Sequence, residues 1–165
     1  MENYICINGK KAELTEEQLK ALGIEISKAN PFARVKKNNQ YFSIDSLGNV
    51  IGVIDDYYDI DTQAYDIANY CTDKSIMEQR ALHETLNRLL WRYSMEHDGD
   101  KIDWTKKSEK KYFIFYHHPN DEYVVKFSWT IGGFGDIFFN SREIAENAIE
   151  EVIKPFMKAH HDFKL

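Results

Sequence analysis

The sequence has little cysteine and proline, and no apolar stretch long enough to cross a bilayer. Cys6 and Cys71 are its only cysteines, and neither stands in a CxxC pair or near a histidine at metal-ligand spacing. A disulfide between them stays open, but two reduced, buried thiols are the favoured interpretation. The beginning, MENYICINGK, has an acid at position 2 and only a short apolar run. We therefore expect a soluble protein of the cytoplasm with no signal peptide.

Basic residues are absent from one long stretch, because no lysine or arginine occurs from residue 38 through 73. The formal net charge of the chain is −6. Proteins that grip nucleic-acid backbones usually present a basic face, so this balance argues against direct nucleic-acid binding without excluding a local basic patch. The charge suits solubility or a partner that is itself basic.

Aromatic and apolar residues are plentiful, at 14% and 43% of the chain. Such a content favours β-rich segments with large buried rings and is enough for a packed interior. A chain of 165 residues suits one compact domain, or two small subdomains that share a core.

The first thirty residues predict a hairpin followed by a short helix. The stretch YICINGKKAEL centres on Asn8-Gly9, a dipeptide that favours the type I′ turn of hairpins. Thr15 and Gln18 have the spacing of a capping box, and Gly23 is typical of a helix end. Residues 24–31 are polar, end in Asn-Pro and indicate a linker.

Two further hairpins are expected downstream. YFSID and NVIGVID alternate on either side of a turn at 46–49, and KYFIFYHHPNDEYVVKFSWTI turns at 119–121. DIFF, ending at Phe139, predicts one more strand.

Two longer helices complete the expected elements, one from about Lys74 to Glu96 and one that Asn140 or Ser141 caps. Pro155 lacks an amide hydrogen, so it should kink or restart the last helix. The apolar stripes of the two helices are Leu82, Leu86, Leu89, Leu90 and Tyr93 in the first, and Ile144, Ala145, Ala148, Ile149, Val152 and Ile153 in the second.

The two hairpins and their helices predict an internal duplication. Tyr41-Phe42 corresponds to Tyr112-Phe113, and Tyr70-Cys71-Thr72 corresponds to Phe138-Phe139-Asn140. One such unit exposes an apolar sheet face and a helix stripe, so two units gain stability by sharing a core. The predicted fold is α+β, with antiparallel sheets and two or three packed helices. The expected segments are an N-terminal hairpin and helix, a first β-β-α unit and a second β-β-β-α unit, at residues 1–30, 31–105 and 106–165.

The order NPFARV, YFSID, YCTDKSIMEQRA, IDW, KYFIFY and DIFFNSREIAENAI resembles small accessory proteins of tailed phages and prophages of Gram-positive bacteria. The pattern covers residues 30–153 and departs in its first helix, where Ser-Ile-Met replaces the usual Glu-Glu-Ala of a threonine-capped helix. This resemblance implies a phage accessory context. Proteins of that kind often bind host or phage macromolecules, including as inhibitors of anti-phage defence systems, and the resemblance supplies no catalytic residues.

Two other groups of residues could form an active site or a small-molecule site. His117 and His118 with Asp121 and Glu122 would suit a hydrolase or nuclease, but adjacent histidines on a strand point to opposite faces. The corner Gly132-Gly133-Phe134-Gly135 could bring backbone amides to a nucleotide or another small molecule, although it precedes a strand. No known catalytic, phosphate-loop or metal motif is present, so we expect neither an enzyme nor a cofactor.

The stretch DDYYDID is the preferred candidate site. Asp55, Asp56, Asp59 and Asp61 surround Tyr57 and Tyr58, either as a solvated loop or as a surface that binds a basic host or phage protein. Acids so close together should repel one another. Replacing all four by asparagine is therefore expected to leave stability unchanged or slightly raised. The sequence leaves the oligomeric state open.

Overall fold

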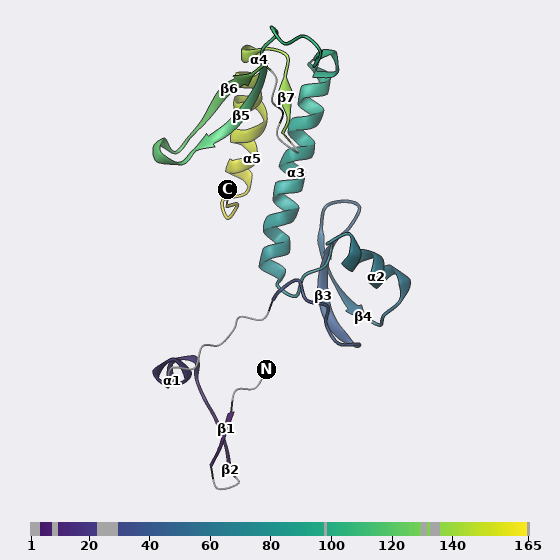
Figure 1. The fold of residues 1–165 in the computed structure, drawn as a ribbon, viewed down its shortest axis with the longest axis vertical. Helices are drawn as coiled ribbons and strands as arrows, with labels where there is room; N and C mark the ends of the chain where they lie inside the picture. The colour runs from purple at the N-terminus through teal and green to yellow at the C-terminus, as the bar shows by residue number, and fades with distance from the viewer. Residues whose placement is uncertain are drawn as a thin grey trace.

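The computed structural model describes residues 4–7, 10–22, 30–97, 99–129, 132 and 136–164. The fold is α+β with antiparallel sheets, as the sequence predicts. A long helix, α3 (Lys74–Glu96), extends between two groups of strands (Figure 1). We call residues 30–73 the first lobe and residues 99–164 the second lobe.

The N-terminal elements are those predicted. Thr15 N–H donates to Gln18 Oε1 at 2.9 Å and Gln18 N–H donates to Thr15 Oγ1 at 3.3 Å, which completes the capping box of the short helix. The elements are β1 (Tyr4–Ile7), β2 (Lys10–Glu13), antiparallel to it, and α1 (Glu16–Ala21). The turn at 8–9, Gly23 and residues 24–29 of the linker lie outside the described residues.

The first lobe places one hairpin between two helices (Figure 1). Strands β3 (Asn39–Ile44) and β4 (Val50–Asp55) pair antiparallel from Asn39 opposite Asp55 to Ile44 opposite Val50. Helix α2 (Asp59–Asp66) bonds to one face through Tyr41 and Asp61. The other face packs on the first turns of α3 in an apolar cluster of Ile44, Cys71, Met77 and Ala81, with Phe42, Val50 and Ile76 beside it.

Helix α2 was not predicted, because its aspartates suggested a loop or an exposed acidic surface. The Asp61 carboxylate explains how this helix begins. Its Oδ2 accepts hydrogen bonds from the backbone N–H groups of Tyr58 at 3.1 Å and Asp56 at 3.2 Å. Donors that a helix start leaves without partners are thereby satisfied from within the helix.

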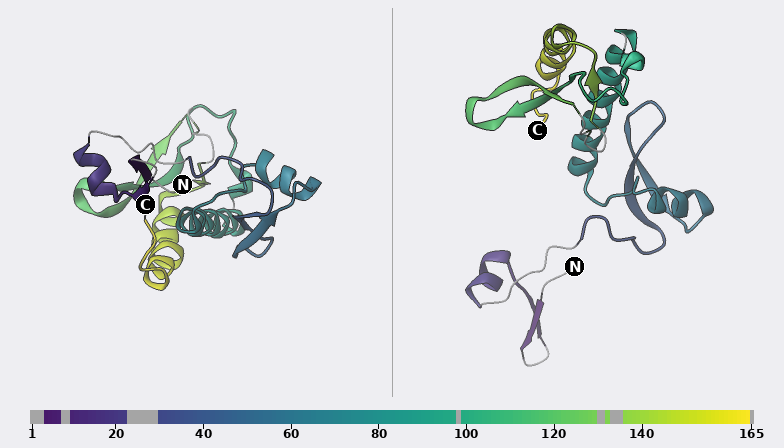
Figure 2. Two further views of the ribbon diagram at one scale, coloured as in Figure 1. Left: turned by 90° about the horizontal axis from the view of Figure 1, so that it is seen from below. Right: turned by 45° about the horizontal axis from the view of Figure 1, so that its top comes forward.

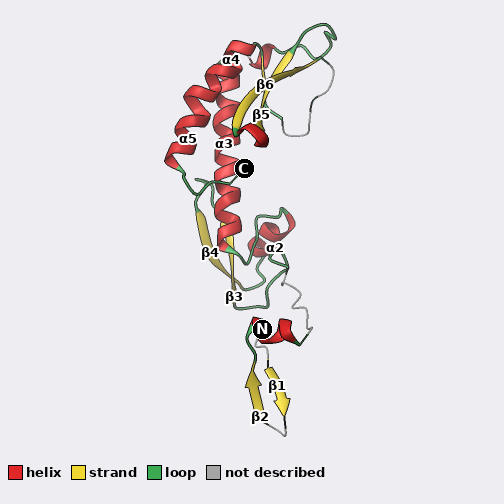
Figure 3. Cartoon of the chain, turned by 90° about the vertical axis from the view of Figure 1, so that its left-hand side faces the viewer, coloured by secondary structure: helices red, strands yellow, loops and turns green. Residues whose placement is uncertain are grey.

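The second lobe is a three-stranded sheet with helices on one side (Figures 2 and 3). The strand order is β6-β5-β7, and both pairings are antiparallel. Ser141 caps the following helix by accepting from Ile144 N–H at 3.1 Å, as predicted. The elements are the 3-10 turns Gly99–Lys101 and His118–Asn120, strands β5 (Lys111–His117), β6 (Glu122–Ser128) and β7 (Phe138–Phe139), helix α4 (Arg142–Ala148), a π-helical segment (Ile149–Ile153) and α5 (Lys154–Ala159).

The last helix passes through Pro155 without stopping. Proline has no amide hydrogen, so the carbonyl four residues earlier, that of Glu151, lacks its usual donor. The five residues Ile149–Ile153 are wound as a π-helix, and α5 follows directly, with Pro155 in its first turn. Within the described part of the chain, no helix combines the length and apolar character needed to cross a membrane.

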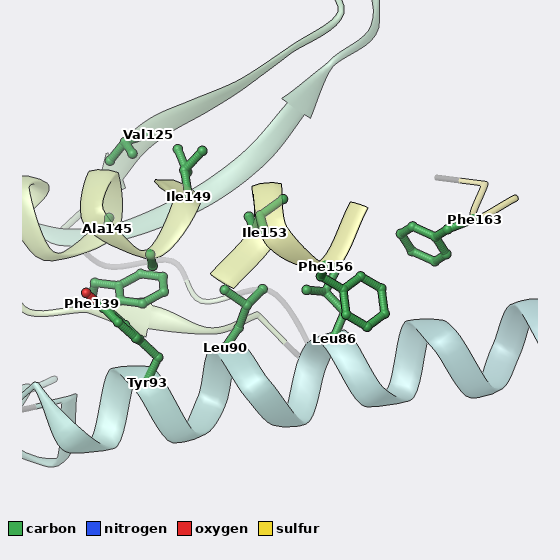
Figure 4. Close-up of a cluster of buried hydrophobic side chains, with 11 residues drawn as sticks. Leu86, Leu90, Tyr93, Val125, Phe139, Ala145, Ile149, Ile153, Phe156 and Phe163 are labelled. Carbon is green, nitrogen blue, oxygen red and sulfur yellow. The ribbon is translucent and has the colours of Figure 1, made fainter. Parts of the chain in front are cut away.

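The core of the second lobe is closed by α3 (Figure 4). Leu86, Leu90 and Tyr93 of α3 meet the apolar side of the sheet and the last helix. The remaining buried members of this cluster are Val125, Phe139, Ala145, Ala148, Ile149, Ile153, Phe156 and Phe163. The stripes predicted for the two helices therefore supply much of one core.

Both lobes repeat one topology, as the sequence correspondence suggested. In each, the first strand of the hairpin pairs antiparallel with a later segment that leads into a capped helix. Phe42 pairs with Cys71 in the first lobe, and β5 pairs with β7 in the second. The cap of α3 is Asp73, whose Oδ1 accepts from Ser75 N–H at 2.8 Å, rather than the threonine before it. The three segments predicted at 1–30, 31–105 and 106–165 stay a prediction.

Candidate functional site

Two of the four clustered aspartates lie inside the protein. Asp55 is 0% exposed and Asp61 is 2% exposed, so neither carboxylate reaches the surface on which the prediction placed it. Asp55 accepts from Arg34 Nε at 3.1 Å and from Tyr70 Oη at 2.9 Å. It also accepts from the backbone N–H of Tyr57 at 2.9 Å. A buried carboxylate with these donors is a structural anchor.

The charge of Asp55 is stabilised by its neighbours. Burial alone would raise the pKa of this carboxyl, because a low-dielectric site disfavours the charged form. Hydrogen bonds from Arg34, Tyr57 N–H and Tyr70 outweigh burial, and the pKa lies below its ordinary value. The hydrogen bond to Asp55 in turn raises the pKa of Arg34. Carboxylate and guanidinium thus stay ionised together.

Two stacked tyrosines link the buried aspartates. The rings of Tyr41 and Tyr70 lie 4.0 Å apart, centroid to centroid, and 13° from parallel. Tyr41 Oη donates to Asp61 Oδ1 at 3.0 Å, and Tyr70 donates to Asp55. Burial raises the pKa of Tyr70 to about 12 and also raises the pKa of Tyr41. Both hydroxyls therefore remain donors across the physiological range.

Tyr57 is held in place on both its backbone and its ring. Its φ of 65° is in the left-handed region, which is uncommon for a residue with a side chain. The Asp55 carboxylate secures its N–H, and Tyr57 Oη donates to the Val35 carbonyl at 3.1 Å. The Arg34 guanidinium lies 4.7 Å from the ring centroid, a cation–π contact. The loop between β4 and α2 is thereby fixed from inside.

The fixed loop and α2 present apolar side chains to solvent. Tyr58 is 68% exposed, Ile60 is 71% exposed and Ile67 is 70% exposed. Asp59 is exposed and Asp56 half-buried within the same segment. We call these five residues the acidic–apolar surface. Exposed apolar groups rimmed by charge are typical of interaction sites.

The roles of the six predicted residues therefore divide. Asp55 and Asp61 are buried and hold the loop, and Tyr57 covers Arg34. Tyr58 and Asp59 are exposed, and Asp56 is half-buried. For Asp55, the pairing of its buried carboxylate with Arg34 argues against the tolerance expected of the four-asparagine variant.

Sequence reasoning missed Arg34, Tyr41 and Tyr70. Arg34 bonds to Asp55 across 21 residues of sequence, and to Thr62 Oγ1 at 3.1 Å. One signal was available. A stretch with seven aspartates and no cation needs a counter-ion if any aspartate is buried, and Arg34 is the nearest arginine before it.

The structure does not bring the residues of the alternative sites together into one site. His117 is half-buried at the end of β5, while His118 lies exposed in the following turn. Asp121 accepts from Tyr116 Oη, and Glu122 accepts from the Asn120 amide at 2.8 Å. Among the described residues, no three histidine, cysteine, aspartate or glutamate side chains gather as metal ligands would. Of the Gly132–Gly135 corner, residues 133–135 lie outside the described part.

Comparisons with protein-family models, with curated proteins and with solved structures gave no match to this chain.

Proposed function

We propose that this protein is a non-enzymatic binding module that docks a basic protein on its acidic–apolar surface. The observation that carries this proposal is the exposure of Tyr58 and Ile60, at the end of a loop and the start of α2 that the Arg34–Asp55 ion pair holds in place. A loop ordered before binding loses less conformational entropy on association.

The chemistry of the surface favours a partner with an apolar patch ringed by lysine or arginine. Tyr58 and Ile60 offer contact area that can be fully desolvated at the centre of an interface. Asp56 and Asp59 add negative charge, and the segment 38–73 contains no lysine or arginine. Such a field speeds association with a basic protein and fades as salt screens it over about 8–10 Å.

The phage-like pattern supports a biological setting for this activity. We propose an accessory role in the cytoplasm of a bacterial host, with a host or phage protein as partner. Inhibition of an anti-phage defence factor would fit that setting, because binding alone can block another protein. No observation favours the nucleotide-sequestering or hydrolase alternatives over it.

A retention experiment tests the proposal. The immobilised chain is exposed to a Gram-positive bacterial extract, and retained proteins are eluted with rising salt and identified by mass spectrometry. Proteins of basic charge should be retained and should elute at moderate salt. The double variant Tyr58→Ser/Ile60→Ser should lose them, while Leu47→Ser, which alters an 83% exposed residue of the β3–β4 turn, should keep them. Equal retention by the double variant and the wild type would refute the proposal.

A further inference from the structure

The two outer edges of the β3–β4 hairpin differ in their backbone hydrogen bonding. On the β3 edge, Phe42 exchanges two backbone hydrogen bonds with Cys71, at 2.7 and 3.0 Å. The Asn69 side-chain amide bonds to both the N–H and the C=O of Ile44, each at 2.8 Å. The chain therefore closes this edge with a short bridge and an amide that imitates a strand.

The alternation of an antiparallel ladder shows which groups of β4 face outward. Because Phe42 and Ile44 point their backbone groups away from β4, their opposite residues, Gly52 and Val50, must also point away from β3. Ile54 follows with the same period. No protein hydrogen bond from the described residues is recorded for the outward backbone groups of these three residues. Among the residues that the structure describes, no strand pairs with this outer row of donors and acceptors on β4.

The sequence of β4 lacks the features that usually prevent another strand from pairing with an exposed edge. Exposed edges are normally blunted by charge, proline or a bulge. The strand VIGVID has no charged residue before Asp55, which is itself buried. The equivalent outer strand of the second lobe, β6, carries Glu122 and Lys126. Ile51 and Ile54 of β4 are 43% and 49% exposed, one on each face of the hairpin. Figure 3 shows β4 on the outer side of its lobe.

We infer that the β4 edge binds an extended basic segment of the partner as an added strand. This inference rests on the proposed function and adds a second contact for the same partner, on the strand that leads into the acidic–apolar surface. Main-chain hydrogen bonds to Val50, Gly52 and Ile54 would supply affinity, and contacts with Ile51 and Ile54 would select apolar side chains on the incoming strand.

Charge decides between a basic partner and a second copy of the chain. Two copies paired through β4 would bring two cation-free acidic segments together, which like-charge repulsion opposes. A basic strand would instead be attracted to this acidic segment. A groove of about 400 Å³ is lined by Val50, His160 and two acidic residues, Glu78 and Asp162. Glu78 also pairs with Lys74 at 2.9 Å, so Asp162 is the acid that an incoming cation would meet first. Lysine or arginine side chains at one end of the added strand would reach this groove.

Amide hydrogen exchange tests the inference on the full chain. The probe is an eight-residue peptide of alternating lysine and valine with blocked ends. In the free protein, the Gly52 and Ile54 amides should exchange fast and the Ile51 and Val53 amides slowly. Saturating peptide should slow exchange at Gly52 and Ile54 at least tenfold and leave Ile51 and Val53 within twofold. Unchanged exchange at Gly52 and Ile54 would overturn the inference.

Two N-methylated peptides sharpen the test. One is methylated at every valine nitrogen and the other at every lysine nitrogen. Only one set of alternate N–H groups faces β4 in an added strand, so one peptide should bind and the other should bind at least tenfold more weakly. Equal binding by both, or binding by neither, would rule out strand addition.

A proline variant provides the test on the protein side. Ile54→Pro removes an outward N–H without removing a bond to β3, whereas Ile54→Ala keeps that N–H. The proline variant should bind the unmethylated peptide at least tenfold more weakly than the alanine variant, and similar binding would count against the inference. If the proline variant fails to fold, the methylated peptides still decide. Retention of basic proteins without protection of the β4 amides would remove strand addition and leave the proposed function standing.

Discussion

At the residue scale, one carboxylate organises the first lobe. Asp55 joins β4 to Arg34, to the tyrosine stack through Tyr70 and to the backbone of Tyr57. Arg34 keeps part of its side chain in solvent, at 27% exposure, while Asp55 has none. Removing the carboxylate's charge therefore leaves a guanidinium in a site built for an anion.

Asp55→Asn should lower the free energy of unfolding by about 3 kcal/mol, the low end of the range for breaking a buried ion pair. The amide nitrogen of asparagine would also face donors in place of an acceptor. Urea unfolding followed by circular dichroism measures the change. Asp56→Asn is the matched control and should stay within about 0.5 kcal/mol, since the side chain of this half-buried neighbour forms no hydrogen bond with the described residues. Coincident unfolding curves for the two variants would contradict the assigned role.

Stability should also depend on the pH through Asp55. Its pKa in the folded protein lies below the value of about 3.9 expected when unfolded. A lowered folded pKa gives stability that is fully present above the unfolded pKa and is lost as the pH falls through the folded pKa. Wild-type stability should therefore decline more steeply below about pH 4 than that of Asp55→Asn. Urea midpoints from pH 2 to pH 6 measure this, and parallel curves would exclude the linkage.

At the element scale, the elements that could be predicted are those with a clear local sequence pattern. The hairpins, the long helix and the caps at Thr15 and Ser141 came from alternation, helical period and turn chemistry, all within a few residues. Helix α2 could not be recognised this way, because its acids suggested repulsion while Asp61 in fact satisfies its first turn. The binding site stays a prediction. The burial of Asp55 could not be predicted from local pattern, because it depends on Arg34, a partner set by tertiary structure.

The C-terminal tail is held on α3 by Gln79 and His83 and by the packing of Phe163. Gln79 of α3 donates to the Asp162 carbonyl at 2.9 Å and accepts from Lys164 N–H at 2.8 Å. Gln79→Ala should speed hydrogen exchange at the Lys164 amide at least tenfold, because that amide loses its acceptor. Glu78→Ala is the control, since Glu78 pairs with Lys74 instead. Equal exchange in the two variants would show that the tail is held without Gln79, through His83 and Phe163.

At the scale of the whole molecule, α3 belongs to both lobes. Met77 and Ala81 pack in the first apolar cluster, and Leu86 and Leu90 pack in the second. The predicted second unit, residues 106–165, lacks the helix that closes its core.

The fragment 106–165 should therefore not fold alone. Its sheet and last helix would expose the apolar faces that Leu86, Leu90 and Tyr93 cover in the full chain. Amide NMR should show poor dispersion for the fragment and good dispersion for the full chain. Adding a synthetic peptide of residues 74–97 should improve the dispersion. A well-dispersed spectrum from the fragment by itself would refute the dependence.

Because α3 is one continuous helix, the number of its residues between the two lobes sets the angle between them. Each residue inserted between Ala81 and Leu86 would turn the second lobe by about 100° about the helix axis and advance it by about 1.5 Å. A one-residue insertion would thus swing the acidic–apolar surface to another side of the second lobe. An insertion of seven residues would restore the orientation to within about 20° while adding about 10 Å of separation. Insertions or deletions of about two helical turns can therefore change the distance between the lobes in evolution and keep their orientation. Shorter changes in length would alter the angle between the lobes.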